Sequence, residues 1–204
     1  MIAIVDYGLG NVQAIANIYK RLELPCTLAR RASDLSPATH IVLPGVGAFD
    51  WAMARLEQSG MREALDEAVL QQKKPALGIC VGMQMLARRS DEGMAAGLGW
   101  IDAEVKRLDA GPADNSRQLP HMGWNDVNPL SREGLFAGFD DTPRFYFLHS
   151  YYFAPNDPAD RLAESDYGAS FACAVRHGHV HGVQFHPEKS HAWGIQLLKN
   201  FATL

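Results

Sequence analysis

Apolar residues in the first half of the chain alternate between short continuous runs and stretches with helical spacing. The continuous runs lie at residues 2–5, 26–29, 40–43 and 75–79. Runs of this kind are typical of strands that are buried on both faces. Between them, apolar residues recur every three or four positions, which predicts helices near residues 12–22, 51–58 and 61–71. This rhythm predicts an α/β fold with a doubly wound, mostly parallel sheet flanked by helices.

Turn and capping residues mark the ends of these elements. Asn11 precedes the first helix, and we expect its side chain to cap that helix. Pro44 and Gly45 follow the third apolar run and are expected to end that strand. Gly60 separates two of the helices. These signals favour short elements joined by tight connections.

The second half of the chain has a different pattern, in which strand-like segments follow one another with turn residues between them. Strands are expected at residues 101–105, 144–148, 151–153, 171–175 and 180–185. A hairpin turn is expected at residues 176–179, an exposed loop at residues 109–118 and a final helix at residues 193–201. The pattern therefore predicts an antiparallel or mixed β extension on the main sheet.

Length and charge narrow the class of protein. With 204 residues, 47% of them hydrophobic, the chain is expected to form one large domain, residues 1–204. The net charge is −4 and no run of Lys or Arg exceeds two residues, so we expect no nucleic-acid partner. No window approaches the ~18 consecutive apolar residues of a membrane span. Residues 1–6 also lack the basic start of a signal peptide.

Cysteine and histidine spacing gives no sign of a metal site. The three cysteines are Cys26, Cys80 and Cys173. Their odd number and wide spacing argue against a disulfide framework or a paired-cysteine zinc site, and favour a reducing cytoplasm. The histidine cluster is His177, His179 and His181. Because it lacks a nearby cysteine or carboxylate pattern, we expect neither a metal nor any other cofactor.

The most informative segment is residues 78–82, Gly-Ile-Cys-Val-Gly, between a predicted strand and a helix-like stretch at residues 83–87. A Gly-x-Cys-x-Gly turn in this context predicts a nucleophile elbow. The glycines are expected to let the backbone bend sharply, so that Cys80 stands exposed at the end of the strand. The positive end of the following helix favours the thiolate, which predicts covalent catalysis.

A cysteine nucleophile needs a base, and His186 is the best placed candidate. It follows a short predicted strand at residues 183–185 and precedes Pro187, so a strand end would deliver its imidazole. Glu188 stands two residues later and is expected to orient the ring and stabilise the imidazolium. His-Pro-Glu alone is also compatible with a polar turn, but together with the elbow it favours a catalytic triad.

Acyl transfer also needs donors for an oxyanion. The amide of Val81 is one candidate, and the segment 44–47, Pro-Gly-Val-Gly, is expected to bring a second amide alongside, at the carboxyl ends of the strands. Gln84 lies four residues after Cys80, on the same helix face. It is a candidate for binding a substrate carbonyl or amide, the alternative being an exposed helical glutamine.

These motifs together resemble those of the class I, or triad, glutamine amidotransferases. Within that family the sequence is most similar to the glutaminase subunits of imidazole glycerol phosphate synthase, an enzyme of histidine biosynthesis. The segments that carry the closer resemblance are residues 6–11 (Asp-Tyr-Gly-Leu-Gly-Asn), 97–100 (Gly-Leu-Gly-Trp), 120–125 (Pro-His-Met-Gly-Trp-Asn), 147–152 (Phe-Leu-His-Ser-Tyr-Tyr) and 184–190 (Gln-Phe-His-Pro-Glu-Lys-Ser).

The resemblance implies a reaction and a partner. Cys80 would attack the side-chain amide of glutamine, helped by His186 and Glu188, to give ammonia and a glutamyl thioester that water hydrolyses to glutamate. The ammonia would pass to a (βα)8-barrel cyclase subunit, the partner in a heterodimer. The cyclase would use it to form imidazole glycerol phosphate and aminoimidazole carboxamide ribonucleotide. The glutaminase would be nearly silent until the cyclase binds its own ligand.

The resemblance also assigns roles to further residues. It implies oxyanion amides at Val46 and Val81 and glutamine contacts from Gly47, Gln84, Ser150 and Tyr151. It places Asn11, Met122 and Trp124 toward the cyclase, with core packing as the alternative for the last two. His121 and His149 are expected to be structural. Residues 12–14, Val-Gln-Ala, replace a Leu-Arg-Ser-like stretch of relatives, which removes a hydroxyl and a charge near the expected partner surface.

Three other functions remain compatible with these residues. The glutaminase could serve another acceptor, in nucleotide, anthranilate or pyridoxal phosphate synthesis. The chain could be a non-catalytic regulatory subunit on the same fold, although Cys80, His186 and Glu188 speak against it. A cysteine hydrolase of the same broad fold is favoured less, because Gln84, Ser150 and Tyr151 are suited to glutamine.

Overall fold

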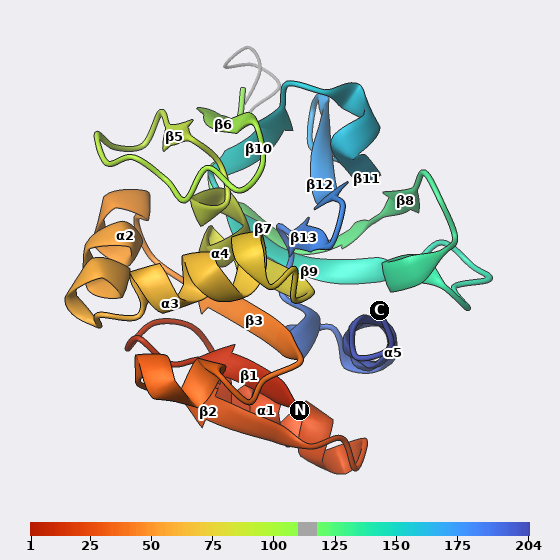
Figure 1. The fold of residues 1–204 in the computed structure, drawn as a ribbon. Coiled ribbons are helices and arrows are strands. Elements are labelled where there is room, and N and C mark those ends of the chain that lie inside the picture. Colours follow the sequence, from red (N-terminus) through yellow and green to blue (C-terminus); the bar gives the residue numbers. More distant parts are fainter. Residues whose placement is uncertain (110–117) are drawn as a thin grey trace.

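The computed structural model describes residues 1–109 and 118–204, which form strands and helices around one large sheet (Figure 1). The strands are β1 (Ile2–Val5), β2 (Cys26–Ala29), β3 (His40–Gly45), β4 (Ala76–Cys80), β5 (Arg89–Ser90), β6 (Ala103–Arg107), β7 (His121–Asp126), β8 (Asn128–Pro129), β9 (Arg144–His149), β10 (Tyr151–Pro155), β11 (Arg161–Asp166), β12 (Ser170–His177) and β13 (Val180–Val183). The helices are α1 (Val12–Arg21), α2 (Phe49–Gln58), α3 (Arg62–Asp66), α4 (Val81–Met85) and α5 (His191–Phe201). Of the loop expected at residues 109–118, positions 110–117 lie outside the described residues.

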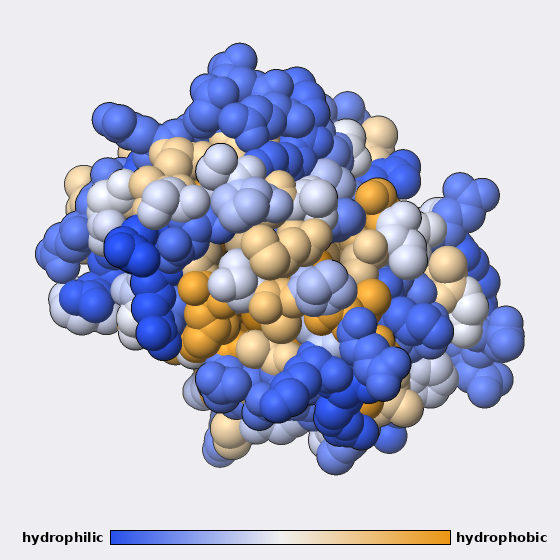
Figure 2. Space-filling model, turned by 60° about the horizontal axis from the view of Figure 1, so that its bottom comes forward, coloured by the Kyte–Doolittle hydropathy of each residue, from blue (hydrophilic) through white to orange (hydrophobic). Residues whose placement is uncertain are grey.

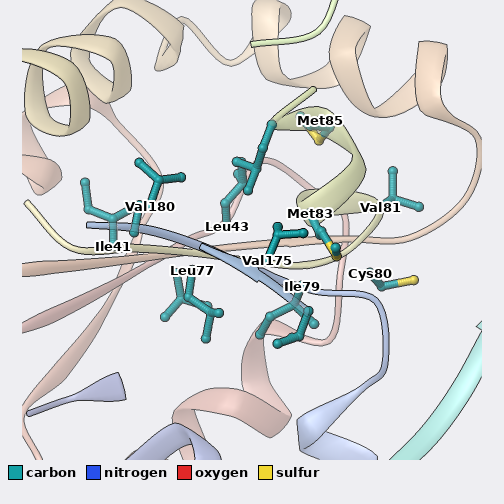
Figure 3. Close-up of a cluster of buried hydrophobic side chains, with 14 of the residues drawn as sticks. Ile41, Leu43, Leu77, Ile79, Cys80, Val81, Met83, Met85, Val175 and Val180 are labelled. Carbon is teal, nitrogen blue, oxygen red and sulfur yellow. The ribbon is translucent and has the colours of Figure 1, made fainter. Parts of the chain in front are cut away.

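The main sheet has eight strands in the order β2-β1-β3-β4-β13-β12-β11-β8. Strands β2, β1, β3, β4 and β13 are parallel to one another. Strands β12, β11 and β8 continue the sheet, each antiparallel to the strand before it in this order. Helices α1 and α5 lie on one face, and α2, α3 and α4 lie on the other (Figures 1 and 3). This confirms the predicted doubly wound, mostly parallel sheet with an antiparallel extension.

The third strand is longer than predicted. Pro44 and Gly45 do not end β3 but belong to it, opposite Ile79 and Cys80 of β4. Successive N–H groups of a strand point to opposite sides, and the N–H of Ile41 bonds on the β4 side. Position 44 therefore faces the β1 side, where pairing has already stopped at Val42. Pro44 is tolerated because no partner strand needs an N–H there.

Other differences from the predicted elements lie in the second half of the chain. The turn at residues 176–179 does join β12 to β13, as predicted. The strand expected at residues 180–185 ends at Val183, because the N–H of His186 bonds to Tyr146 of β9 instead. Strands β7 and β11 were not predicted, since polar residues occupy about half of each. β7 pairs with β9 in a two-stranded ribbon, and β10, β6 and β5 form a third sheet.

Three glycines let α4 pack directly against the ends of β3 and β4. A β-carbon on Gly82 would lie 1.9 Å from the carbonyl oxygen of Leu43, and one on Gly78 would lie 2.7 Å from the Cα of Met83. One on Gly45 would lie 2.5 Å from the amide nitrogen of Gly82. The glycines are thus needed for close approach rather than for the sharp bend that the sequence suggested, because the positive φ falls on the cysteine between them.

A buried apolar cluster surrounds this contact (Figure 3). Leu77 and Ile79 of β4 point to one face of the sheet, while Leu43 of β3 points to the other, where Met83 of α4 packs. The sulfur of Cys80 points out of the cluster, beyond the strand end (Figure 3). The core therefore holds the segment on both faces, with the thiol directed away from it. The expectation that Cys80 stands exposed is wrong, because the residue is only 4% exposed.

The surface of the molecule is not uniformly polar. On the face shown in Figure 2, hydrophobic residues gather in a central strip with hydrophilic residues around it. No helix among the described residues has the length and apolarity needed to cross a membrane.

We expect Gly82→Ala to lower the free energy of unfolding by about 3 kcal/mol, because its β-carbon would overlap the Leu43 carbonyl in a well-packed core. Gly178→Ala is the matched control. Gly178 has a φ of +58° and open space around it, so only backbone strain of about 1 kcal/mol applies there. Urea denaturation of both variants measures the difference. Equal losses would contradict the proposed close packing of α4.

Candidate active site

Cys80 lies at the junction of β4 and α4, with its backbone held at a φ of +56° and a ψ of −115°. Positive φ is uncommon for a residue other than glycine, and such strain persists only where the surrounding structure enforces it. The sulfur lies 3.9 Å from the carbonyl oxygen of Leu148 and 3.9 Å from the amide nitrogen of Gln184. Helix α4 is only five residues long, so the dipole acting on the sulfur is that of its first turn.

His186 and Glu188 follow β13, the strand that pairs with β4 on the side away from β3. Nδ1 of His186 lies 2.7 Å from Oε1 of Glu188, and the two side chains are only 4% and 2% exposed. His186 is anchored through its N–H to Tyr146, and Glu188 lies in a 3₁₀ turn, Pro187–Lys189, that opens with the proline. With Nδ1 used by Glu188, the other ring nitrogen is free to face Cys80.

Asn11 joins this pair from the opposite end of the sequence. Its Nδ2 donates to Oε1 of Glu188 at 2.7 Å, across 177 positions. The expected side-chain cap of α1 is therefore wrong: Asn11 stands at the N-cap position, but its side chain makes no capping hydrogen bond. The amide orients Glu188 instead.

The electrostatics of the pair favour a charged histidine. Burial lowers the pKa of His186, but hydrogen bonds to Cys80 and Glu188 and the charges of both outweigh it, raising the pKa to about 10. Burial raises the pKa of Glu188, and the hydrogen bond and charge of His186 outweigh that effect, helped by Asn11, so the pKa lies below its usual value. The arrangement stabilises an imidazolium next to the thiol.

Most of the expected site residues line one cavity of about 380 Å³. The lining consists of Asn11, Val46, Gly47, Cys80, Val81, Gln84, Glu92, Pro120, Leu148, His149, Ser150, Tyr151, His186 and Lys189. Glu188 lies behind His186. The structure therefore brings together the predicted triad, both predicted oxyanion residues and all four predicted glutamine contacts.

Strand register explains why the two oxyanion candidates meet. Gly45 is the register partner of Cys80, so the residues that follow them, Val46 and Val81, leave adjacent strand ends together. Gly47 then turns the chain with a φ of +88° and open space where a side chain would lie. Val46 and Gly47 of this turn line the same cavity as Cys80.

Gln84 is 3% exposed, which excludes the exposed helical glutamine considered above. Its Nε2 donates to the carbonyl of Tyr151 and to Oε1 of Gln184, each at 3.1 Å. Both amide hydrogens are thus engaged, and the amide oxygen is the group that can accept a hydrogen bond from a ligand. Gln184 in turn points its own amide at the sulfur of Cys80.

Glu92 is a lining residue that the sequence did not single out. Its Oε2 accepts a hydrogen bond of 2.9 Å from the N–H of Phe49, the first residue of α2. A carboxylate held in this way gives the cavity a fixed negative charge. Glu92 follows Asp91 in a short polar segment after a two-residue strand, and such a segment has no pattern that marks one carboxylate as a site residue.

Met122 and Trp124 do not line the cavity. They lie on the outer face of β7, 65% and 41% exposed, so core packing is excluded for both. Met122 is the register partner of Leu148, a half-exposed residue that also lines the cavity. An apolar surface therefore borders the mouth of the site.

The histidine cluster on the β12–β13 hairpin is dispersed among different partners. His177 pairs with Asp160 at 2.9 Å, and His179 donates to the carbonyl of Val69 at 2.7 Å. His181 faces the carbonyl of His179 at 3.2 Å. Within residues 1–109 and 118–204, no three metal-ligating side chains gather.

The chain belongs to the class I glutamine amidotransferase family, whose model matches residues 3–203. Its relatives within that family include three proteins named imidazole glycerol phosphate synthase subunit HisH. That of Bdellovibrio bacteriovorus is 57% identical over 204 residues, which is 100% of both chains. That of Leptospira interrogans is 45% identical over the same extent. That of Methanococcus maripaludis is 41% identical over 98% of both chains.

Solved structures support the fold. A structure described as glutamine amidotransferase superposes with a TM-score of 0.77 at 20% sequence identity, over 99% of this chain and 97% of the other. PurLQS from Thermotoga maritima superposes with a TM-score of 0.73 at 17% identity, over 99% and 97%. At these identities the likeness concerns the fold alone.

We expect Glu188→Gln to lower the pKa of His186, because the substitution removes the carboxylate charge that helps to oppose the effect of burial. In the unchanged protein, the imidazolium should persist through pH 8. NMR titration of the His186 ring measures both pKa values. Equal pKa values in the two proteins would contradict the assignment of Glu188 as the charged partner.

The same pair makes stability depend on pH. The folded-state pKa of His186, about 10, lies above the ordinary value of 6.5, so the folded state binds the proton more tightly. The stabilisation is complete below pH 6.5 and is lost as the pH rises through 10. Urea denaturation between pH 7 and 10 should therefore show a steeper loss of stability in the unchanged protein than in Glu188→Gln.

Proposed function

We propose that this chain is the glutaminase subunit of imidazole glycerol phosphate synthase, and that it hydrolyses glutamine to glutamate and ammonia for a cyclase partner. The observation that carries the proposal is the convergence of Cys80, His186 and Glu188 at one cavity. Family membership and the names of full-length relatives support the substrate and the pathway over another acceptor.

In the proposed reaction, the thiolate of Cys80 attacks the side-chain amide carbon of glutamine. The carbonyl oxygen becomes an oxyanion, for which the backbone amides of Val46 and Val81 are the proposed donors. His186 gives its proton to the departing nitrogen, so that ammonia leaves and a glutamyl thioester remains. Water then attacks the thioester, with His186 taking its proton, and glutamate and the thiolate are released.

Glu188 and Asn11 are proposed to prepare His186 for both proton transfers. The carboxylate holds Nδ1–H, which leaves Nε2 as the nitrogen that gives and takes the proton. Asn11 fixes the carboxylate through the same oxygen. The negative charge of Glu188 also stabilises the imidazolium that is present before the attack on glutamine and again after water has given up its proton.

Recognition of glutamine is proposed to use charge and backbone together. Glu92 supplies a negative charge for the α-ammonium group of the substrate. The oxygen of Gln84 accepts from an N–H of the substrate. Gly47, Ser150 and Tyr151 border the same space and contact the rest of the amino acid.

The proposed cyclase surface includes Met122, Trp124 and Leu148, with Asn11 at its edge. Leu148 belongs both to this surface and to the cavity wall, so a partner seated there would cover the mouth of the cavity. Ammonia released at Cys80 would then have a short path into the partner, the cyclase subunit of a heterodimer. We place the complex in the cytoplasm, in keeping with three free thiols.

We expect Cys80→Ala to abolish glutamine-dependent synthesis of imidazole glycerol phosphate by the complex with the cyclase. Synthesis from added ammonium salt should be unchanged, because the cyclase then receives ammonia from solution. Both rates are measured by product formation with the ribonucleotide substrate. Loss of both activities would contradict the division of labour between the subunits.

The partner assignment is tested by activation. Adding the cyclase and its ribonucleotide ligand should raise glutamine hydrolysis strongly over that of the chain alone, measured as glutamate formed. Absence of stimulation would favour a different acceptor. Labelling of Cys80 by an electrophilic glutamine analogue tests the substrate separately.

We expect Trp124→Ala to weaken binding of the cyclase about 30-fold, since a large aromatic anchor at an interface is worth about 2 kcal/mol. Trp51→Ala is the matched control, because Trp51 is also exposed, at 54%, but lies on α2. Isothermal titration of each variant with the cyclase measures the dissociation constants. Similar weakening by both substitutions would exclude a specific role for the β7 surface.

A further inference from the structure

A chain of hydrogen bonds outside the proposed triad ends at a carbonyl of the glutamine cavity. Its central members are His121 on β7 and His149 on β9, which are register partners across the two-stranded ribbon. Nδ1 of His121 lies 3.0 Å from Nε2 of His149. Nδ1 of His149 lies 2.8 Å from the carbonyl oxygen of Tyr151. Both rings are buried, at 3% and 6% exposure.

The direction of every hydrogen bond in this chain follows from its last member. A carbonyl oxygen only accepts, so Nδ1 of His149 carries the proton. Burial lowers the pKa of His149 to about 3 and that of His121 to about 4, so both rings are neutral. Nε2 of His149 is then an acceptor, and Nδ1 of His121 must donate to it. Each ring is confined to one tautomer.

The other end of the chain is fixed by Asn125. Its Nδ2 lies 3.2 Å from Nε2 of His121 and also donates to the carbonyl of Asp166 at 2.8 Å. Its Oδ1 accepts from the N–H of Asp126, which sets the orientation of the amide. Protons therefore point in one direction, from Asn125 through His121 and His149 to Tyr151.

The carbonyl of Tyr151 connects this chain to the groups around the substrate. It accepts from His149 and from Nε2 of Gln84 together. Gln84 also bonds to Gln184, whose amide faces the sulfur of Cys80. If His149 lost its orientation, the shared carbonyl would lose one of its two side-chain donors and Gln84 would be held less firmly.

We propose that His121 and His149 are positioning residues for glutamine, which act by holding the Tyr151 carbonyl and, through it, Gln84 and the segment 150–151. This inference rests on the proposed function, because the ligand of that segment is glutamine. It assigns a role in substrate affinity to two histidines that do not take part in the proton transfers at Cys80.

The hydrogen-bonded histidines and the proposed partner surface lie on opposite faces of strand β7. Alternate residues of a strand point to opposite faces. Met122 and Trp124 are exposed on one face, whereas His121 and Asn125 of the other face belong to the hydrogen-bonded chain. A shift of β7 on binding of the cyclase would therefore reach Tyr151 directly.

Two substitutions of His121 separate positioning from packing. His121→Phe keeps a ring that can stack between Tyr167 and Phe147, whose centroids lie 4.1 and 4.7 Å away, but it removes the donor to His149. His121→Asn keeps an N–H where Nδ1–H lies but loses the ring. Positioning predicts that the Phe variant binds glutamine less well than the Asn variant, whereas packing alone predicts the reverse.

The experiment measures KM and kcat for glutamine hydrolysis by the complex with the cyclase and its ligand. We expect His121→Phe to raise KM about tenfold, the effect of losing one buried hydrogen bond, and to change kcat less than about threefold. His121→Asn should recover most of the affinity although it is the less stable of the two in thermal unfolding. An unchanged KM in His121→Phe would overturn the proposal.

The tautomer of His149 gives a second, independent readout, which is measured on the protein without the cyclase. Two-bond ¹⁵N–¹H NMR spectra of the unsubstituted protein should show the proton of His149 on Nδ1. A proton on Nε2 would overturn the proposal even if His121→Phe failed to fold. Failure of the unsubstituted complex to hydrolyse glutamine would instead contradict the proposed function, and the tautomer does not depend on that result.

Discussion

The site depends on one packing contact, the close approach of the first turn of α4 to the ends of β3 and β4. Gly45, Gly78 and Gly82 each lack the β-carbon that would collide with backbone across this contact. With both sides held, the three residues between Gly78 and Gly82 have no room to relax, and the middle one, Cys80, is left at a positive φ. The same approach puts Val81 next to Val46, because Gly45 and Cys80 are register partners. Steric exclusion thus places the thiol, and strand pairing places the candidate oxyanion amides.

A second layer of the site comes from electrostatics. The parallel strands end at the thiol, and the segment after β13 brings His186 and Glu188 to it from the next strand over. A buried charged pair is costly unless its members satisfy each other. Here each shifts the pKa of the other toward the charged form, and Asn11 donates a second hydrogen bond to the same oxygen, Oε1, while the buried Oε2 has no partner among the described residues. One carboxylate oxygen of Glu188 therefore links Asn11, at the start of α1, to His186, which faces Cys80.

Sequence patterns predicted the strands and turns whose formation depends on neighbouring residues in the chain. The continuous apolar runs at residues 2–5 and 26–29 became β1 and β2 with the same bounds. Burial on both faces holds for β1 but not for β2, which is the edge strand and has three partly exposed residues. The motifs at residues 44–47, 78–84 and 186–188 led to residues that do meet at one cavity. The contact between Asn11 and Glu188 had no local signal, because it joins residues 177 positions apart. Glu92 and the strand β11 were also missed, the first because it lies in a short polar segment without a motif and the second because half of its residues are charged. The role of Gly78 and Gly82 was misjudged, because close approach of two backbone segments and a sharp bend of one segment both call for glycine.

The central claim is that Cys80 carries the glutamyl group during turnover. Rapid quenching of the complex with the cyclase, its ligand and glutamine, followed by mass spectrometry of the peptide that contains residue 80, tests it directly. The account predicts a glutamyl adduct on Cys80 that appears within one turnover and disappears when glutamine is exhausted. Glutamine hydrolysis at full rate with Cys80 unmodified throughout, together with retained hydrolysis in Cys80→Ala, would contradict it.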